Sequence, residues 1–409
     1  MGKNTNKQWD LVVIGAGASG MMAAITAARE NKRVCILEKL DKAGKKLLAT
    51  GNGKCNFTNE NMQVDCFGGD ETFVNKVLDQ FSVEDCLEFF HSIGIYPKNK
   101  NGYYYPNSEQ AASVTNALLY ELERLGVKVF YEVKVKDISA NTEEVCVWTQ
   151  KDCIIAKKLV IATGLLAAPK LGSDGSLFEV IKSLGHRFAP ILPTLCGFYC
   201  KGMKFKQVSG VRAHGTVSAY IDGRKTTEDT GEIQFTDYGL SGIPVFQISR
   251  DLSKGLYAKQ KVEIKLNLLP QFKKQELIDE INFRRSLAAS MPITALLNGL
   301  VNQKLSDMIL EKAGVDKQLY ASSVSDDEIV KIVELLQDIN VTVTNYRDFE
   351  FAQVCTGGIP TSDIDHDTLE SKFAPNVHFA GEILDVDGIC GGYNLHFAWA
   401  TGYMAGRTK

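Results

Sequence analysis

The chain has 409 residues, of which 44% are hydrophobic and 23% charged, with a formal net charge of −3 at pH 7. These values are ordinary for a globular protein of about two or three domains, and the missing basic excess argues against a general binder of nucleic acids or membranes. The ten cysteines include no C-x-x-C pair, so neither a zinc site nor a disulfide framework is expected.

The first apolar stretch, residues 11–28, resembles a signal peptide or a membrane span in its composition. Three glycines interrupt it, however, at positions that a nucleotide-binding turn explains better. No other uncharged stretch reaches the about 20 apolar residues that a bilayer requires. We therefore expect a cytoplasmic protein that does not bind a membrane.

Residues 10–38 have the pattern of a dinucleotide-binding β-α-β unit. The strand DLVVIG leads into Gly15-Ala-Gly17-Ala-Ser-Gly20, and an alanine-rich helical segment follows. Gly15 permits the tight turn, Gly17 lets the backbone approach a pyrophosphate, and Gly20 lets the helix pack on its strand. The helix N-terminus offers N–H groups to the phosphates. The second strand, RVCILE, ends on Glu38, which is placed to bind a ribose hydroxyl.

The residues after this acid favour FAD over NAD. Lys39, Gly44, Lys45 and Lys46 follow Glu38 in a pattern that resembles the E-x5-G-(G/R/K) sequence of glutathione-reductase-like FAD domains. An enzyme that binds only NAD does not need this glycine and cation pair. Because FAD is much longer than an adenosine, further contacts are expected downstream.

Two later segments supply such contacts. KLVIATG breaks at Thr163 and Gly164, and the strand NVHFAGE ends at Gly381 and Glu382. ICGGYN then leads into a helix behind Gly392, whose N-terminal dipole would stabilise the anionic reduced flavin if it were aimed at the N1/C2 oxygen region.

The polar segment KKLLATGNGKCNFTN, residues 45–59, is too glycine-rich for a helix interior and too polar for a core strand. We interpret it as the segment that follows FAD from its ribose towards the flavin. Gly51 and Gly53 would allow close backbone approach, and Asn52, Asn56 and Thr58 would offer hydrogen bonds.

These blocks together resemble the BaiN-type, aminoacetone-oxidase-like family of bacterial flavoproteins. The shared sequences are KLLATGNGKCNFTN, GEIQFTDYGLSG, TGGIP and FAGEILDVDGICGGYNLHFA, in that order. The chain departs from the family at Lys45 and Lys54, where arginine is common, at Ile243 within the usual SGP, and at His396, where glutamine is frequent. The resemblance places backbone near Val133 against the adenine. The full set of predicted FAD-binding residues is Gly15, Gly17, Ala18, Ser19, Gly20, Glu38, Lys39, Lys45, Lys46, Asn52, Gly53, Cys55, Asn56, Val133, Thr163, Gly164, Gly381, Glu382, Gly392, Tyr393 and Asn394.

The rest of the sequence indicates an insertion into the α/β fold. Helices are predicted over 83–96 and 109–126 and strands over 127–139 and 143–149, before short strands and turns begin near residue 190. Three helical patterns follow in 272–340. We expect a glutathione-reductase-like FAD-binding Rossmann domain with an inserted β-barrel and a small helical domain. The predicted limits are 1–190 for the N-terminal part of the FAD domain, 191–270 for the barrel, 271–345 for the helical domain and 346–409 for the C-terminal part.

The predicted function is that of an FAD-dependent oxidoreductase with a small-molecule substrate. The resemblance implies NAD(P)H-dependent reduction of a conjugated C=C bond in a 3-oxo steroid or bile-acid-like molecule, and FAD-dependent amine oxidation is an alternative. Because only one dinucleotide fingerprint is present, NADH or NADPH would dock transiently. An FAD-binding protein without turnover is a further alternative, and the sequence does not indicate an oligomeric state.

A flavoprotein that acts on tRNA is another class. It would need a basic patch on the insertion, for which the candidates are Lys201, Lys204, Lys206, Arg212, Arg224 and Lys225. The negative net charge argues against this class, so no nucleic-acid partner is expected.

No catalytic residue is evident from the sequence. Tyr104, Tyr393 and His396 are proton-donor candidates only because each could reach a cavity, and a helix histidine with satisfied ring nitrogens explains His396 more simply. Cys55 and Cys390 could form a redox pair only if the fold brought both to the flavin. The acidic residues 363–367 are interpreted as a solvated turn, and no metal site is expected.

Overall fold

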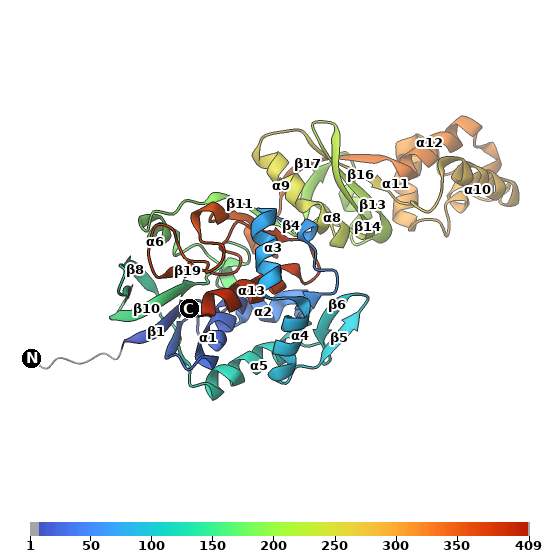
Figure 1. The fold of residues 1–409 in the computed structure, drawn as a ribbon. Helices are drawn as coiled ribbons and strands as arrows, with labels where there is room; N and C mark the ends of the chain where they lie inside the picture. The colour runs from blue at the N-terminus through green and yellow to red at the C-terminus, as the bar shows by residue number, and fades with distance from the viewer. Residues whose placement is uncertain (1–7, 408–409) are drawn as a thin grey trace, which may run out of the picture. The chain divides into compact units, whose positions relative to one another are not determined.

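A computed structural model describes residues 8–407. The chain forms two compact units: the sheet unit, up to Leu192 and again from Gln353, and the barrel unit, Pro193–Ala352. The barrel unit is inserted between two strands that pair with each other, β11 (Ala189–Thr194) and β18 (Val354–Gly358). Figure 1 traces the course of the chain through both units. The finer division of the insertion at residue 271 stays a prediction.

The sheet unit is built on a mixed sheet with the strand order β7-β2-β1-β10-β9-β8, in which β19 lies beside the end of β10. From β7 to β19 the neighbouring strands are parallel, and β9 and β8 add an antiparallel flank. The carboxyl ends of the parallel strands therefore meet at one edge, where folds of this class bind their ligands. The strands are β1 (Trp9–Ile14), β2 (Val34–Leu37), β7 (Lys128–Phe130), β8 (Val135–Ala140), β9 (Val145–Thr149), β10 (Cys153–Ile161) and β19 (Val377–Phe379).

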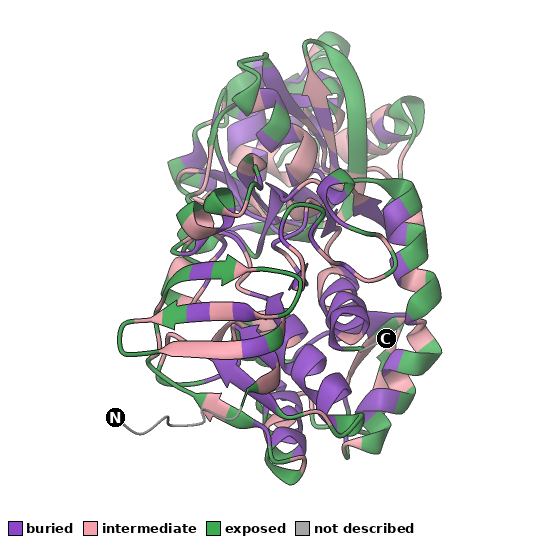
Figure 2. Ribbon diagram, turned by 60° about the vertical axis from the view of Figure 1, so that its left-hand side comes forward, coloured by how far each residue is buried: buried purple, intermediate pink, exposed green. Residues whose placement is uncertain are grey.

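Two helices, α1 (Ala18–Arg29) and α13 (Tyr393–Gly406), pack against each other beside this sheet (Figure 1). Their contact requires glycine, because a β-carbon at Gly402 would lie 2.4 Å from the carbonyl oxygen of Ser19, and one at Gly406 equally close to that of Ala23. Both helices and the parallel strands β1, β2 and β19 are largely buried, and buried residues are purple in Figure 2. Within residues 8–407, no helix combines the length and apolar character needed to cross a bilayer.

Shorter elements complete the sheet unit. Its remaining strands are β3 (Thr58–Asn59), β4 (Phe67–Gly68), β5 (Pro97–Lys100), β6 (Tyr103–Pro106) and β20 (Asp387–Gly388). Its other α-helices are α2 (Lys45–Ala49), α3 (Glu71–Gln80), α4 (Val83–Ser92), α5 (Ala111–Arg124) and α6 (Phe178–Ser183). Its 3-10 helices are η1 (Thr50–Gly53), η2 (Val64–Cys66), η3 (Pro169–Leu171) and η7 (Thr361–Asp363).

Two predicted elements have different limits in the structure. The helix predicted over 83–96 ends at Ser92, because Gly94 adopts a positive φ of 89°. The strand predicted over 127–139 is two strands, β7 and β8. The break occurs where Glu132 has a φ of 58° and the N–H of Val133 donates to the carbonyl of Glu38 at 2.9 Å.

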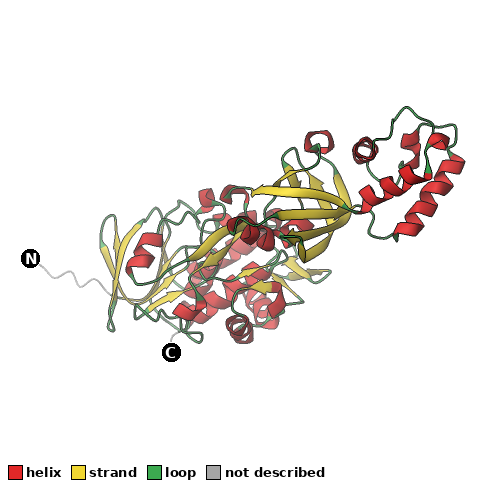
Figure 3. Cartoon of the chain, turned by 90° about the horizontal axis from the view of Figure 1, so that it is seen from above, coloured by secondary structure: helices red, strands yellow, loops and turns green. Residues whose placement is uncertain are grey.

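The barrel unit contains a closed barrel with the strand order β12-β15-β14-β13-β16-β17 and a group of helices beyond it (Figure 3). Residues such as Val217, Ala219, Ile264 and Leu266 alternate with more exposed neighbours and fill the interior. The strands are β12 (Phe198–Lys201), β13 (Arg212–Ile221), β14 (Arg224–Phe235), β15 (Gly239–Ser241), β16 (Val262–Asn267) and β17 (Ile339–Tyr346). The helices are α7 (Phe205–Val208), α8 (Ile243–Gln247), α9 (Ser249–Tyr257), α10 (Lys274–Leu287), α11 (Gln303–Ala313), α12 (Asp326–Gln337), η4 (Ile293–Leu296), η5 (Ala321–Ser323) and η6 (Phe349–Phe351).

Candidate flavin site

The three fingerprint glycines have different structural roles. Gly15 has a φ of +103°, and a β-carbon there would lie 2.6 Å from the carbonyl oxygen of Ala162. A β-carbon at Gly20 would lie 1.9 Å from the carbonyl oxygen of Gly15. Around Gly17, the N-cap of α1, a β-carbon would meet nothing within 4 Å, and no side chain caps the helix. Gly15 and Gly20 are therefore needed for packing, whereas Gly17 keeps space open before helix N–H groups that would suit a phosphate.

Ala18 and Ser19 begin α1 behind this open space. Ser19 is buried, and its hydroxyl donates to the carbonyl of Ala380 at 3.2 Å. The adjacent Gly381 has a φ of +80°, and its N–H donates to the Thr401 hydroxyl at 2.9 Å. These bonds connect the start of α1 to the end of β19, so the two predicted cofactor segments meet at one place.

Glu38 lies at the end of β2, with its carboxylate against the fingerprint loop. One carboxylate oxygen accepts from the N–H of Ala16 at 2.8 Å and the other from that of Leu40 at 2.9 Å. A carboxylate oxygen can accept more than one hydrogen bond, so ribose hydroxyls can still be bound. The N–H of Val133 is already used by the Glu38 carbonyl. The predicted adenine contact at Val133 would therefore involve its carbonyl rather than its N–H.

The three predicted lysines differ in their surroundings. Lys46 pairs with Glu382 at 2.5 Å, and the other oxygen of Glu382 accepts from the N–H of Cys355 at 2.8 Å. Lys39 pairs with Asp174, and Lys45 pairs with Asp41 at 2.5 Å. Of these three pairs, only that of Lys46 joins two predicted cofactor segments. The pair of Lys45 with Asp41 lies within one turn of the chain and gives no sign of a cofactor.

Gly164 lies beside the Lys46–Glu382 pair. It follows Thr163, which is partly exposed at the end of β10, and has a φ of +65°. A β-carbon at Gly164 would lie 3.3 Å from the Glu382 carboxylate and 2.9 Å from the Ser173 hydroxyl. Gly164 therefore lies next to two other predicted cofactor-binding residues, Lys46 and Glu382, and there is no space for a side chain at position 164.

The segment after α2 turns sharply through left-handed conformations. Gly51, Asn52, Gly53 and Cys55 have φ values of 56°, 55°, 81° and 57°. Residues 51–54 are exposed and residues 55–59 are buried. Asn52 and Gly53 therefore lie on the surface, apart from the buried Asn56 with which they were predicted to act.

The buried part of this segment is fixed from both sides. The N–H of Phe57 donates to the Tyr104 carbonyl at 3.0 Å, and the Trp399 indole donates to the Phe57 carbonyl at the same distance. The side-chain amide of Asn59 donates to the Gly391 carbonyl at 2.8 Å. The segment is thus held between the β5–β6 hairpin and α13. No sequence pattern around Trp399 indicates its indole bond.

An unpaired acceptor and unpaired donors meet at the start of α13. The side-chain oxygen of Asn56 is buried without a hydrogen-bond partner, and a β-carbon at Gly392 would lie 2.9 Å from it. Gly392 is the N-cap of α13, and no side chain caps the helix. Leaving such an acceptor unpaired costs about 1–3 kcal/mol. A flavin carries N–H and C=O groups along one edge, so it fits this cradle.

The side chain of Asn394, which the sequence predicts to bind FAD, instead bonds to the backbone of Gly388. Its oxygen accepts from the N–H of Gly388 and its amide donates to the carbonyl of Gly388, both at 2.8 Å. The side chain therefore holds the preceding loop, and only the Asn394 backbone remains for a cofactor. The spacing of six residues between Gly388 and Asn394 is the only sequence signal for this pair of bonds.

The family model described as "HI0933-like protein Rossmann domain" matches residues 9–408. The chain belongs to the HI0933-like family. It is 40% identical to the 3-dehydro-bile acid delta(4,6)-reductase of Clostridium scindens over 97% of both chains. It is 28% identical to the ribosomal RNA dihydrouridine synthase of Haemophilus influenzae over 96% of both, and 25% identical to that of Escherichia coli over 97% of both. The protein is an FAD-dependent oxidoreductase with an α/β Rossmann fold, as the sequence predicts.

Two predicted proton donors of this HI0933-like protein lie in its core. His396 is fully buried, with one ring nitrogen 2.8 Å from the Thr58 hydroxyl and the other 3.0 Å from the Phe81 carbonyl. Tyr393 is buried edge-on against Phe67, with ring centroids 5.8 Å apart, and burial raises the pKa of its phenol. Because both ring nitrogens of His396 are occupied, we no longer expect it to donate a proton. The phenol of Tyr393 keeps its proton near pH 7, and its role as a donor stays a prediction.

Buried histidines should make this HI0933-like protein sensitive to acid. Burial lowers the pKa of His396 to about 4 and that of His378 to about 3, from an ordinary value of 6.5. Below pH 6.5 the unfolded chain takes up protons that the folded chain does not. The contribution of these histidines to the free energy of unfolding should therefore be most favourable above pH 6.5. Between pH 6.5 and pH 4, each histidine should lower the free energy of unfolding by about 1 kcal/mol per pH unit.

Urea unfolding between pH 7 and pH 4.5 measures this slope. His396→Gln should reduce the slope by about 1 kcal/mol per pH unit, which is the contribution of one histidine. If the unfolding free energy of the His396→Gln variant changed with pH as steeply as that of the wild type, the lowered pKa of His396 would be contradicted.

The thiol of Cys55 is not suited to redox chemistry. It is fully buried, and burial raises its pKa to about 12. Cys390 is half-buried, and neither residue is in a disulfide. Because thiol–disulfide exchange requires an accessible thiolate, the structure argues against the Cys55–Cys390 pair.

Cys55→Ser should therefore keep turnover within about threefold of wild type, since a small buried side chain is replaced by one of similar size. Native-state alkylation with iodoacetamide, read by mass spectrometry, should modify the half-buried Cys146 and Cys390 before Cys55. Rapid labelling of Cys55, or a hundredfold loss of turnover, would restore the redox hypothesis.

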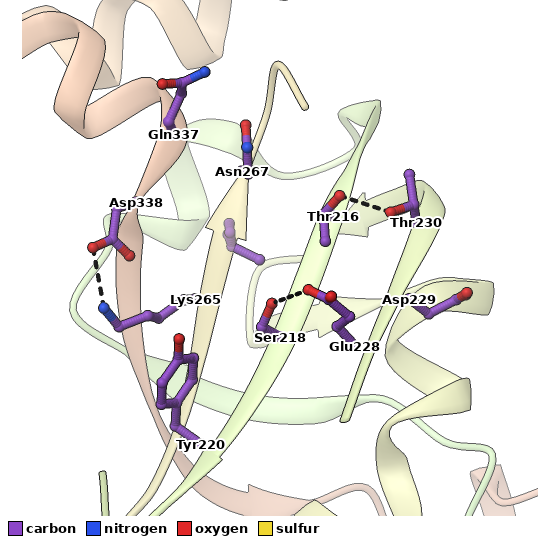
Figure 4. A pocket seen from close by; sticks show the side chains of 11 residues that line it. Thr216, Ser218, Tyr220, Glu228, Asp229, Thr230, Lys265, Asn267, Gln337 and Asp338 are labelled. Carbon is purple, nitrogen blue, oxygen red and sulfur yellow. Dashed lines mark hydrogen bonds and ion pairs between the residues drawn. The ribbon is translucent and has the colours of Figure 1, made fainter. Parts of the chain in front are cut away.

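A polar groove of about 640 Å³ lies on the barrel unit between β13, β14 and β16. Its side chains largely pair with one another, as Figure 4 shows: Thr216 with Thr230 at 2.7 Å, Ser218 with Glu228 at 3.0 Å, and Lys265 with Asp338 at 3.0 Å. Because its polar side chains already pair with one another, we interpret the groove as a solvated surface. We do not propose it as the site of the family's chemistry.

Proposed function

We propose that the protein reduces a conjugated C=C bond of a 3-oxo steroid-like substrate with NADH or NADPH as the electron donor. The observation that carries this proposal is the 40% identity, over 97% of both chains, to a reductase whose name specifies a 3-dehydro-bile acid. The reaction adds a hydride to one carbon of the double bond and a proton to the other, and the donor becomes NAD⁺ or NADP⁺.

When bound, FAD supplies the two-electron exchange between donor and substrate. The residues of this chain would hold it at three places. The N-terminus of α1 behind Gly17 would bind its phosphates, and Glu38 would bind a ribose. Asn56 and the N-terminus of α13 would bind the polar edge of the flavin. The α13 dipole favours negative charge at that position, which would stabilise the anionic reduced flavin formed when the donor delivers its hydride.

The proton that completes the reduction has no assigned donor in the sheet unit. Both ring nitrogens of His396 are occupied, and the ring of Tyr393 is buried against Phe67. The side chain of Tyr104 lies on β6 and is partly exposed. Tyr104, Tyr393 and solvent water are the proton sources that this proposal leaves open.

Reduction of uracil in RNA is the second candidate, and the two dihydrouridine synthases favour it, since they match this chain over 96% and 97% of its length. The C5=C6 bond of uracil is conjugated with a carbonyl, so the chemistry is of the same type. Electrostatics argue against it. Three of the six predicted basic residues are paired with carboxylates: Lys204 with Glu311, Arg212 with Glu232 and Lys225 with Glu228.

Product analysis separates the two candidates. The FAD-loaded enzyme is incubated without oxygen with NADPH and either a 4-en-3-one steroid acid or an unmodified ribosomal RNA transcript. We expect a steroid product heavier by two hydrogens and no dihydrouridine, both read by mass spectrometry. Dihydrouridine without steroid reduction would overturn the proposal in favour of RNA.

A further inference from the structure

The barrel unit holds an arginine inside a cluster of aromatic rings. Arg347 directly follows β17, and its guanidinium carbon lies 3.6 Å from the centroid of Phe351, 4.4 Å from that of Tyr238 and 5.9 Å from that of Tyr199. We call these four residues the arginine cage. The Arg347 backbone is fixed as well, because its N–H donates to the Gly197 carbonyl at 2.9 Å.

The members of the arginine cage come from separate parts of the chain. Tyr199 lies on β12, Tyr238 lies between β14 and β15, and Phe351 ends η6. Tyr199 and Tyr238 also contact each other, with ring centroids 5.2 Å apart. The barrel fold therefore brings three rings to one guanidinium, an arrangement that local sequence cannot produce.

The charge of Arg347 has no counter-charge. Among residues 8–407, no carboxylate forms an ion pair with it, and its Nε is buried without a hydrogen-bond partner. Other arginines of the same unit are paired, Arg212 with Glu232 and Arg284 with Glu280. Aromatic rings attract a cation but do not accept its N–H bonds as a carboxylate does. The outer N–H groups of Arg347 are thus left for a ligand.

The cage also reaches the surface. Phe351 is 53% exposed and Tyr199 is 37% exposed, although both are large apolar side chains. A ligand bound at Arg347 would cover these rings, so the site suits a molecule with an apolar or planar body and one anionic end.

We propose that the arginine cage binds a carboxylate or phosphate group of an organic ligand. A guanidinium with rings over its faces presents its N–H donors at the edge, in a fork that matches two oxygens of one oxyanion. Resting on the proposed function, two ligands supply this chemistry: the carboxylate of a steroid acid substrate, or a phosphate of the nicotinamide donor. The arginine cage belongs to the barrel unit, whereas the residues that would hold the flavin belong to the sheet unit.

Binding measurements on the FAD-loaded enzyme test this site. Dissociation constants are measured by calorimetry for a 4-en-3-one steroid acid, its methyl ester and NADPH. The variants are Arg347→Met, which removes the charge, and Arg347→Lys, which keeps the charge but lacks the fork. Arg224→Met, which removes an exposed arginine elsewhere on the barrel, is the matched control.

Arg347→Met should weaken binding of the acid by about 10- to 100-fold, the effect of losing charge-assisted hydrogen bonds, and leave the ester unchanged. The affinity of the Arg347→Lys variant for the acid should lie between those of the Arg347→Met variant and the wild type. If NADPH binding weakens instead, the oxyanion is the donor's phosphate. If wild type and the folded Arg347 variants bind each of the three ligands with equal affinity, the site is overturned. Because binding is read without turnover, failure to reduce the steroid overturns only the proposed function.

Discussion

Gly17→Asp is expected to abolish FAD binding while the apoprotein stays folded. The β-carbon of residue 17 would point into open space, with nothing within 4 Å, and φ at this position is −86°, which any residue can adopt. Aspartate is a favourable N-cap and suits the positive end of a helix dipole, so α1 itself should not be weakened. The same carboxylate would occupy the space of a phosphate and repel it.

The measurement is the ratio of flavin to protein after purification, together with thermal unfolding of the flavin-free form. We expect less than about one tenth of the wild-type flavin content, with an apoprotein at least as stable as the wild-type apoprotein. Gly17→Asn fills nearly the same volume without the charge, so it should retain more flavin than Gly17→Asp. Full flavin content in both variants would place the phosphates elsewhere.

Gly20→Val, three residues along, should fail in a different way. A β-carbon at Gly20 would lie 1.9 Å from the carbonyl oxygen of Gly15 and 3.3 Å from the side chain of Ala162. Neither backbone atoms nor a packed alanine can move aside without separating α1 from β1 and β10. The free energy of unfolding of the apoprotein should fall by about 3 kcal/mol or more, the upper range for overpacking.

Urea unfolding of the flavin-free protein measures this loss, with Gly94→Ala as a control on an open loop where no neighbour lies within 4 Å of the added carbon. The control should cost about 1 kcal/mol, because Gly94 has a positive φ. A Gly20→Val apoprotein as stable as the control would show that α1 does not pack as described. A substitution at Gly17 should therefore affect FAD binding alone, whereas one at Gly20 should affect folding.

The features that sequence analysis predicted well are those fixed by local chemistry. The strand, the glycine turn and the acid at Glu38 lie within one β-α-β unit, in which Gly15 and Gly20 are required by the backbone and Gly17 keeps space open. The change of composition near residue 190 indicates the insertion. These features depend on neighbours in the chain, which a sequence displays directly.

The features that were missed depend on distant contacts. The sequence favours a helix histidine with satisfied ring nitrogens for His396, but it does not show the partners, Thr58 and Phe81, which are 338 and 315 residues away. The break between β7 and β8 reflects a bond from Val133 to Glu38. The strand β17 belongs to the barrel although it follows the helices in the chain, because it pairs with β12 and β16. Arg347 stands out only once its three rings are assembled.

The central claim is that this chain uses FAD to pass electrons from a nicotinamide donor to a conjugated C=C bond. Anaerobic stopped-flow absorbance of the purified protein tests it most directly. NADPH or NADH should bleach the flavin band near 450 nm, and a 4-en-3-one steroid acid should then restore it, each step at least as fast as steady-state turnover, about 1–1000 s⁻¹ for typical enzymes. A flavin that neither donor bleaches, or that the steroid does not reoxidise, would contradict the claim.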